Sequence, residues 1–142
     1  MPKVPHSPFT LDNFTVTESH ISRKPLGKKK KFDLQINPSA IIHDKTKIFE
    51  LILKVFVSEK SERFKAHVEA HGFFSYKDVS EDPKLKDLFY FNAPAIIYPY
   101  IRAYISSLTA LSGMEAITIP VLIMGGLKKE LEENTITLTE EE

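Results

Sequence analysis

The sequence predicts an α+β fold, with a four-stranded antiparallel meander sheet that carries a long helix and a short C-terminal helix on one face. Three observations predict it. Four segments alternate apolar and polar residues, one later segment has apolar residues at helical spacing, and short turn-like segments separate the strands. With 142 residues, of which 42% are hydrophobic, the chain is long enough for one domain with its own core.

The expected domain organisation has three parts. Residues 1–8 contain three prolines and no periodicity, so we expect a flexible lead-in. Residues 9–127 are expected to form a single domain. Residues 128–142 are rich in glutamate, and we expect an acidic, partly disordered tail in which residues 128–133 form a helical turn.

The four strands are expected at residues 9–21, 32–42, 48–57 and 64–74. The third has the strongest alternation and is expected to be central. In the fourth, the polar positions place two histidines and a glutamate on one face, opposite the apolar residues. One face of the sheet is therefore expected to carry the helices while the other stays partly hydrated.

The long helix is expected over residues 93–111, after a short helical piece at about residues 84–91. Asn92 is a candidate N-cap, and Pro94 suits the first turn. Pro99 removes one hydrogen bond, and Gly113 stands where a left-handed residue ends a helix. The apolar positions that share one face are Ile97, Ile101, Tyr104, Ile105, Leu108 and Leu111.

Composition excludes several classes of function. The 19 basic and 19 acidic residues balance, which argues against a dedicated nucleic-acid binder. No apolar stretch approaches the roughly 20 residues of a membrane span, so we expect no membrane insertion and a cytoplasmic location. The chain has no cysteine, no phosphate-binding loop and no spacing typical of a catalytic triad. We expect no catalysis and no cofactor.

The histidines of the fourth strand leave two alternatives open. His67, Glu69 and His71 share one face and would clamp a metal only if the strand curled inward. A solvated face, or a histidine-based response to pH, is the favoured interpretation. We therefore expect no metal site.

The run from Ala93 to Leu108, followed by Gly113, resembles the signature helix of the SecB family of export chaperones. The residues that carry the resemblance are Pro99, Tyr100, Arg102, Ile105, Ser107 and Leu108. The strand order and the Gly72-Phe73-Phe74 end of the fourth strand match as well, so the resemblance covers roughly residues 9–124.

The resemblance implies dimers that assemble into a homotetramer, with long grooves that hold unfolded chains without ATP. We therefore expect an ATP-independent holdase that serves protein export or a dedicated client such as an antitoxin. The alternative is a structural or interaction protein whose aromatic surface is filled permanently by one partner.

Aromatic density suggests where clients bind. Nine of the fifteen aromatic residues lie between Phe73 and Tyr104, and aromatic walls suit promiscuous apolar contact. The alternative is that these rings form core and subunit interface. The expected client-groove residues are Phe73, Phe74, Tyr76, Phe89, Phe91 and Tyr98. The expected oligomer interface, chosen for small residues on the helix, is Tyr104, Ser106, Ser107 and Ala110.

The resemblance implies that the translocation motor SecA docks on acidic residues of the exposed sheet face. This sequence departs from the family pattern at those positions. Asn13 and Thr17 stand where carboxylates are expected, and Lys65 and His67 replace an apolar and an acidic residue. SecA is thus a partner only if Glu18, Glu69 or the acidic tail compensates.

The basic cluster that includes Lys28 to Lys31 has two interpretations. It is either a solvated hairpin loop or a positive rim that favours acidic client segments.

Overall fold

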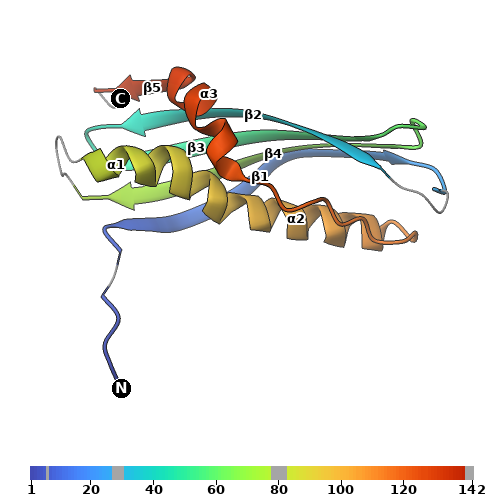
Figure 1. Ribbon diagram of the computed structural model, residues 1–142, viewed down its shortest axis with the longest axis horizontal. Helices are drawn as coiled ribbons and strands as arrows, with labels where there is room; N and C mark the ends of the chain where they lie inside the picture. The colour runs from blue at the N-terminus through green and yellow to red at the C-terminus, as the bar shows by residue number, and fades with distance from the viewer. Residues whose placement is uncertain (6, 27–30, 78–82, 140–142) are drawn as a thin grey trace.

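The computed structural model describes residues 1–5, 7–26, 31–77 and 83–139, and it has a sheet with helices along one side (Figure 1). The strands are β1 (Phe9–Arg23), β2 (Phe32–His43), β3 (Ile48–Glu59), β4 (Phe64–Tyr76) and β5 (Thr135–Leu138). The helices are α1 (Pro83–Asp87), the π-helix η1 (Leu88–Asn92), α2 (Ala93–Leu111), the 3₁₀-helix η2 (Met124–Leu127) and α3 (Lys128–Glu133).

The α+β class, the long helix and the short C-terminal helix are confirmed, but the expected meander order is wrong. The sheet order is β1-β4-β3-β2-β5, so β1 pairs with β4 and not with β2. Arg23 ends β1 opposite Phe64, and Phe32 begins β2 opposite Glu59. The β3–β4 hairpin thus lies between β1 and β2 in the sheet. Eight residues, 24–31, connect β1 to β2, which are three strand spacings of about 4.8 Å apart.

The C-terminal segment contains a strand that the sequence did not predict, within the expected acidic, partly disordered tail of residues 128–142. Lys128–Glu133 is helical as expected, and Leu131 is fully buried. Thr135–Leu138 then pairs in parallel with Ala40–His43, because the edge of β2 offers unpaired main-chain groups. Residues 140–142 lie outside the described residues. The expectation that residues 1–8 are flexible stays a prediction.

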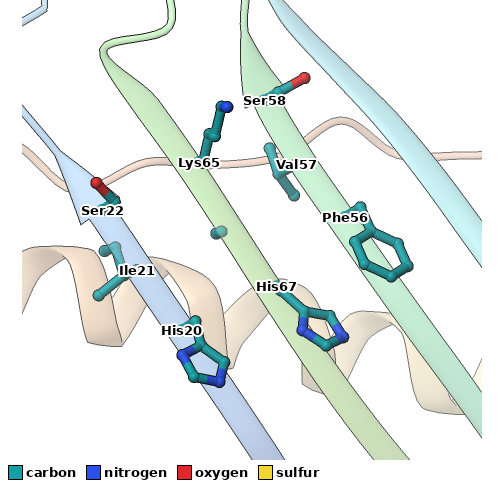
Figure 2. Close-up of a pocket in the computed structure, with 9 residues that line it drawn as sticks. His20, Ile21, Ser22, Phe56, Val57, Ser58, Lys65 and His67 are labelled. Carbon is teal, nitrogen blue, oxygen red and sulfur yellow. The ribbon is translucent and has the colours of Figure 1, made fainter.

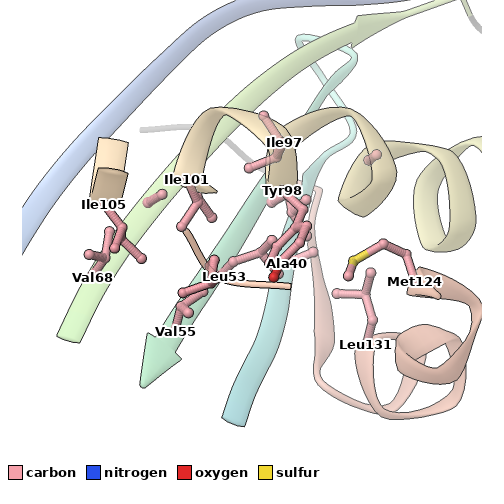
Figure 3. Close-up of a cluster of buried hydrophobic side chains, with 14 of the residues drawn as sticks. Ala40, Leu53, Val55, Val68, Ile97, Tyr98, Ile101, Ile105, Met124 and Leu131 are labelled. Carbon is pink, nitrogen blue, oxygen red and sulfur yellow. The ribbon is translucent and has the colours of Figure 1, made fainter. Parts of the chain in front are cut away.

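The core lies between the sheet and α2. Alternate residues of β3 and β4 face the helix and are buried, whereas the intervening residues form the outer face. Figure 3 shows Ile97, Ile101 and Ile105 of α2 pointing toward Leu53 and Val68 of the sheet, and all five are buried. Burying each such side chain stabilises the fold by about 1.5–3 kcal/mol, which makes this interface the main support for α2.

The ends of α2 show one difference from expectation. Asn92 has helical dihedral angles of φ −72° and ψ −41° and makes no capping bond, because helical structure already runs from Pro83 through η1. Gly113 has φ +84° and ends the helix as expected. Pro99 lies inside α2, which continues past it. None of the helices in the described ranges has the length and apolarity needed to cross a membrane.

Gly72 lets α2 approach β4 closely. A Cβ atom placed on Gly72 would lie 2.5 Å from Cδ1 and 2.8 Å from Cγ1 of Ile97, which is closer than carbon atoms pack. The absence of a side chain at residue 72 therefore sets the distance between helix and sheet.

We predict that Gly72→Ala destabilises the fold by roughly 1–3 kcal/mol through overpacking, measured by chemical denaturation. Ile97→Val removes the Cδ1 atom that the new methyl group would strike. The double variant should therefore lose less stability than the sum of the two single variants. Additive losses would contradict this account of the helix–sheet contact.

Candidate functional site

An extended segment, residues 115–123, returns alongside α2 (Figure 1) and is called the strap below. Side chains of α2 hold its main chain. Tyr98 Oη donates to the carbonyl of Pro120 at 2.6 Å, and Arg102 Nε donates to the carbonyl of Ile119 at 3.0 Å. These bonds supply what a helix or sheet would otherwise supply to the main chain.

The same stripe of α2 continues toward its C-terminus. Ser106 Oγ donates to the carbonyl of Ile117 at 3.0 Å, and the amide of Ile117 donates to Thr109 Oγ1 at 2.8 Å. Thr109 in turn donates to the carbonyl of Ile105 at 2.8 Å. Successive spacings of four, four and three residues from Tyr98 place these side chains on one side of α2. These side chains of α2 thus bind the strap through its main-chain groups.

A groove of about 310 Å³ lies between α2 and the strap, called the α2–strap groove. Among the described residues that line it, Arg102 alone is charged. Val121 and Ile123 expose 77% and 91% of their area there, and Phe91 exposes 46%. Exposed apolar side chains gathered in a groove typically mark a binding surface. The apolar lining residues used below are Phe91, Tyr98, Val121, Leu122, Ile123 and Met124.

A second groove of about 520 Å³ lies between the start of β2 and the strap, lined by Phe32, Thr118 and Pro120 with two charged neighbours. We call it the β2–strap groove. Within the described part of the chain, β5 covers β2 only at Ala40–His43, so residues 32–39 have no strand partner on that side. An open strand edge can pair with an extended polypeptide through main-chain hydrogen bonds.

Two of the six expected groove residues lie in the α2–strap groove. Phe91 is exposed there, and the buried ring of Tyr98 lines it while its hydroxyl holds the strap. Phe73 lies on the opposite, outer face of the sheet, with its ring 6.4 Å from that of His71.

The other three expected groove residues are a correction, because the structure places them in the core. Phe74, Tyr76 and Phe89 are buried. The ring of Phe74 stacks on Phe9 at 4.5 Å, and that of Phe89 stacks on Phe49 at 4.3 Å. The reason is strand alternation: Phe74 and Tyr76 fall on the helix-facing side of β4.

Of the four expected oligomer-interface residues, two are exposed and two make contacts within the chain. Ser107 and Ala110 are exposed on α2, whereas Ser106 holds the strap and Tyr104 Oη lies 2.8 Å from Ser19 Oγ.

Every exposed residue of α2 is uncharged, which is unusual for a helix face in water. The exposed stripe contains Ile96, Tyr100, Ala103, Ser107, Ala110 and Leu111.

The outer face of the sheet carries a network of ionisable side chains. His71 Nδ1 is 2.9 Å from Glu50, and His71 Nε2 is 3.0 Å from Glu69. His43 Nε2 is 3.1 Å from the other oxygen of Glu50, and Lys54 Nζ is 3.7 Å from Glu69. His71 is therefore held between the carboxylates of Glu50 and Glu69.

This network changes the ionisation of its members. Burial disfavours the charged form of His71. Hydrogen bonds to Glu69 and Glu50, together with the negative charges of these two carboxylates, favour the charged form more strongly. The pKa of His71 therefore lies above its ordinary 6.5. The hydrogen bond from His71 lowers the pKa of Glu69, helped by the Thr17 hydroxyl and Lys54. Among the described residues, no group of three or more His, Asp or Glu side chains is placed to hold a metal ion.

Comparison with known proteins gives a family match and two similarities. The SecB family model, described as preprotein translocase subunit SecB, matches residues 14–122. The chain is 32% identical over 89 residues to the uncharacterized protein MJ0357 of Methanocaldococcus jannaschii, a match that covers 60% of this chain and 57% of that protein.

The structure is similar to that of the SecB-like chaperone Rv1957 of Mycobacterium tuberculosis, in complex with a ChAD peptide from the Rv1956 HigA1 antitoxin. The TM-score is 0.68 at 17% identity, with 80% of this chain and 90% of that chain covered. This likeness shows that the fold is shared.

We predict that Thr109→Val loosens the strap. Valine has the same shape but cannot accept the amide proton of Ile117, which stays buried and unpaired at a cost of about 1–3 kcal/mol. Amide hydrogen exchange at residues 117–119 should become faster, and the free energy of unfolding should fall. Thr118→Val, at an exposed position of the strap, is the matched control. Equal exchange in both variants would show that the Thr109 hydroxyl does not hold the strap.

We also predict a pH dependence from His71. Its folded-state pKa is raised, so its charged form stabilises the fold fully below pH 6.5, and this stabilisation is lost as the pH rises through the raised value. The difference in unfolding free energy between the native chain and His71→Gln should therefore be largest in acid and shrink above neutrality. Denaturation curves at several pH values measure it. A difference that grows with pH would contradict the network.

Proposed function

The chain belongs to the SecB family, and from that premise we propose that it is an ATP-independent chaperone that holds non-native polypeptide in the two grooves beside the strap. The observation that carries the proposal is the exposure of Val121 and Ile123 in the α2–strap groove, together with the stretch of β2 that has no strand partner at the β2–strap groove. Unfolded chains offer both of the features that such a site would bind, apolar side chains and unpaired main-chain groups.

The chemistry of the grooves suits reversible holding. Apolar burial supplies roughly 25 cal/mol per Å² without demanding a particular sequence. The β2 edge adds main-chain hydrogen bonds, which every polypeptide can make. Several weak subsites on one client give tight overall binding, yet each releases easily, so no nucleotide is needed.

The client is proposed to be an extended segment of a non-native protein, either for export or for one dedicated partner. The Mycobacterium tuberculosis chaperone that shares the fold holds a peptide from an antitoxin, which supports a restricted client such as an antitoxin. The location is proposed to be the cytoplasm, where such clients are made.

Engagement of SecA by acidic contacts on the outer sheet face is not favoured. Exposed Asn13, Thr17 and Lys65 carry no negative charge. The carboxylates of Glu69 and Glu18 are already paired with His71 and with His20, at 3.0 Å in each case. A basic motor segment would have to displace these histidines, which reduces the gain from its charge.

Assembly into a homotetramer is the second part of the proposal. The exposed face of α2 is uncharged, and its small residues Ala103, Ser107 and Ala110 would let another copy of the helix approach closely. The alternative function is an interaction protein whose grooves hold one permanent folded partner. It would not suppress the aggregation of unrelated unfolded proteins.

We predict that Val121→Ser and Ile123→Ser each weaken binding of a labelled, permanently unfolded protein about threefold to tenfold, measured by fluorescence anisotropy, because each removes apolar contact. Val4→Ser is the matched control. Val4 exposes 84% of its area, similar to the 77% of Val121, but lies outside both grooves.

Unchanged binding in both groove variants would remove the basis for this site. An equal loss with Val4→Ser would show that general surface hydrophobicity, and not the groove, attracts the client.

A further inference from the structure

A hollow of about 410 Å³ lies on the outer face of the sheet, on the side opposite α2 (Figure 2). It crosses β1, β4 and β3 near the hairpin that joins the last two. Two rows of side chains at matched positions on the three strands bound it, and we call it the outer trough. One row is Phe56, His67 and His20, and the other is Ser58, Lys65 and Ser22.

The first row forms a flat, largely apolar wall. The ring of His67 is parallel to that of Phe56 within 2°, with centroids 4.5 Å apart, and parallel to that of His20 within 5° at 6.1 Å. Phe56 still exposes 37% of its area. Aromatic walls of this kind receive apolar or flat groups with little loss of side-chain entropy.

The second row offers an ammonium group and two hydroxyls, and none of the described residues that line the trough is acidic. Glu18 lies nearby, but its carboxylate is bonded to His20 at 3.0 Å. Asp33, opposite Ser58 on β2, lines a neighbouring hollow instead.

This end of the sheet also carries exposed basic side chains. Lys24, Lys60 and Arg63 are exposed there, as are the carboxylates of Glu62 and, on β2, Asp33. The ammonium group of Lys65 lines the trough itself, and it favours an anionic group there.

His67 adds an independent observation. Its Nε2 atom is buried and has no hydrogen-bond partner among the residues that the structure describes. Buried polar atoms in native proteins are nearly always paired. The described residues thus leave one polar atom in the wall of the trough unsatisfied.

We propose that the outer trough binds an acidic, extended segment of a partner protein. A carboxylate of the segment meets Lys65 between Ser22 and Ser58, and an adjacent apolar side chain lies against Phe56 and His67. A peptide fits better than a nucleic acid because the trough contains only one lysine and half of it is apolar, whereas a phosphate backbone requires several cations. The site is separate from the strap grooves, which lie on the other face of the sheet.

The test uses a fluorescent peptide of about ten residues with alternating glutamate and leucine, and its glutamine counterpart. We expect the acidic peptide to bind at least about tenfold more tightly, and Lys65→Gln to weaken it about fivefold. Lys86→Gln, at an exposed position of α1, is the control and should leave binding unchanged. Lys65→Glu should reverse the preference toward a lysine–leucine peptide.

Three results would overturn the proposal. The first is equal binding of the glutamate and glutamine peptides, or no effect of Lys65→Gln. The second is tighter binding of single-stranded DNA than of the acidic peptide, which would indicate a general polyanion surface. The third is peptide binding only after deletion of Glu140–Glu142, which would show that the chain's own acidic end occupies the trough.

Discussion

The hydrogen bonds from α2 to the strap are the interaction on which the rest of the structure depends. Tyr98, Arg102 and Ser106 hold three carbonyl groups of a chain that has neither helix nor strand to satisfy them. Because these bonds use one side of α2 and the core uses another, the helix connects sheet and strap. Two grooves exist only because the strap is held in this position. Without these bonds, Val121 and Ile123 would have no fixed place beside α2.

A single extended chain explains why apolar side chains remain exposed here. Ile117 and Ile119 point into the core and are buried, whereas the strap leaves Val121 and Ile123 uncovered. A helix or sheet would have buried them against a second layer. The fold thus displays apolar area beside an open strand edge, and the sheet keeps its opposite face for a different, charged chemistry. The two faces therefore differ in the partners they suit.

The alternation and helical spacing in the sequence were enough to predict β1 to β4 and α2 closely, because both depend on local periodicity. The predicted meander order is wrong, since nothing local distinguishes β2 from β4 as the neighbour of β1. Aromatic density could not separate Phe91 and Tyr98, which line the α2–strap groove, from Phe74 and Phe89, which are core residues. The signal for the missed residues was the apolar run after Pro120, which fits no helix or strand.

The most direct test of the central claim is the mass of the purified protein, alone and with one substrate in unfolded and folded forms, by size exclusion with light scattering. The account predicts a tetramer that co-elutes with the unfolded substrate and not with the folded one. A monomer indifferent to both forms, or an oligomer that binds only the folded form, would contradict it. In that case, the SecB fold of this chain would serve a purpose other than holding non-native polypeptide.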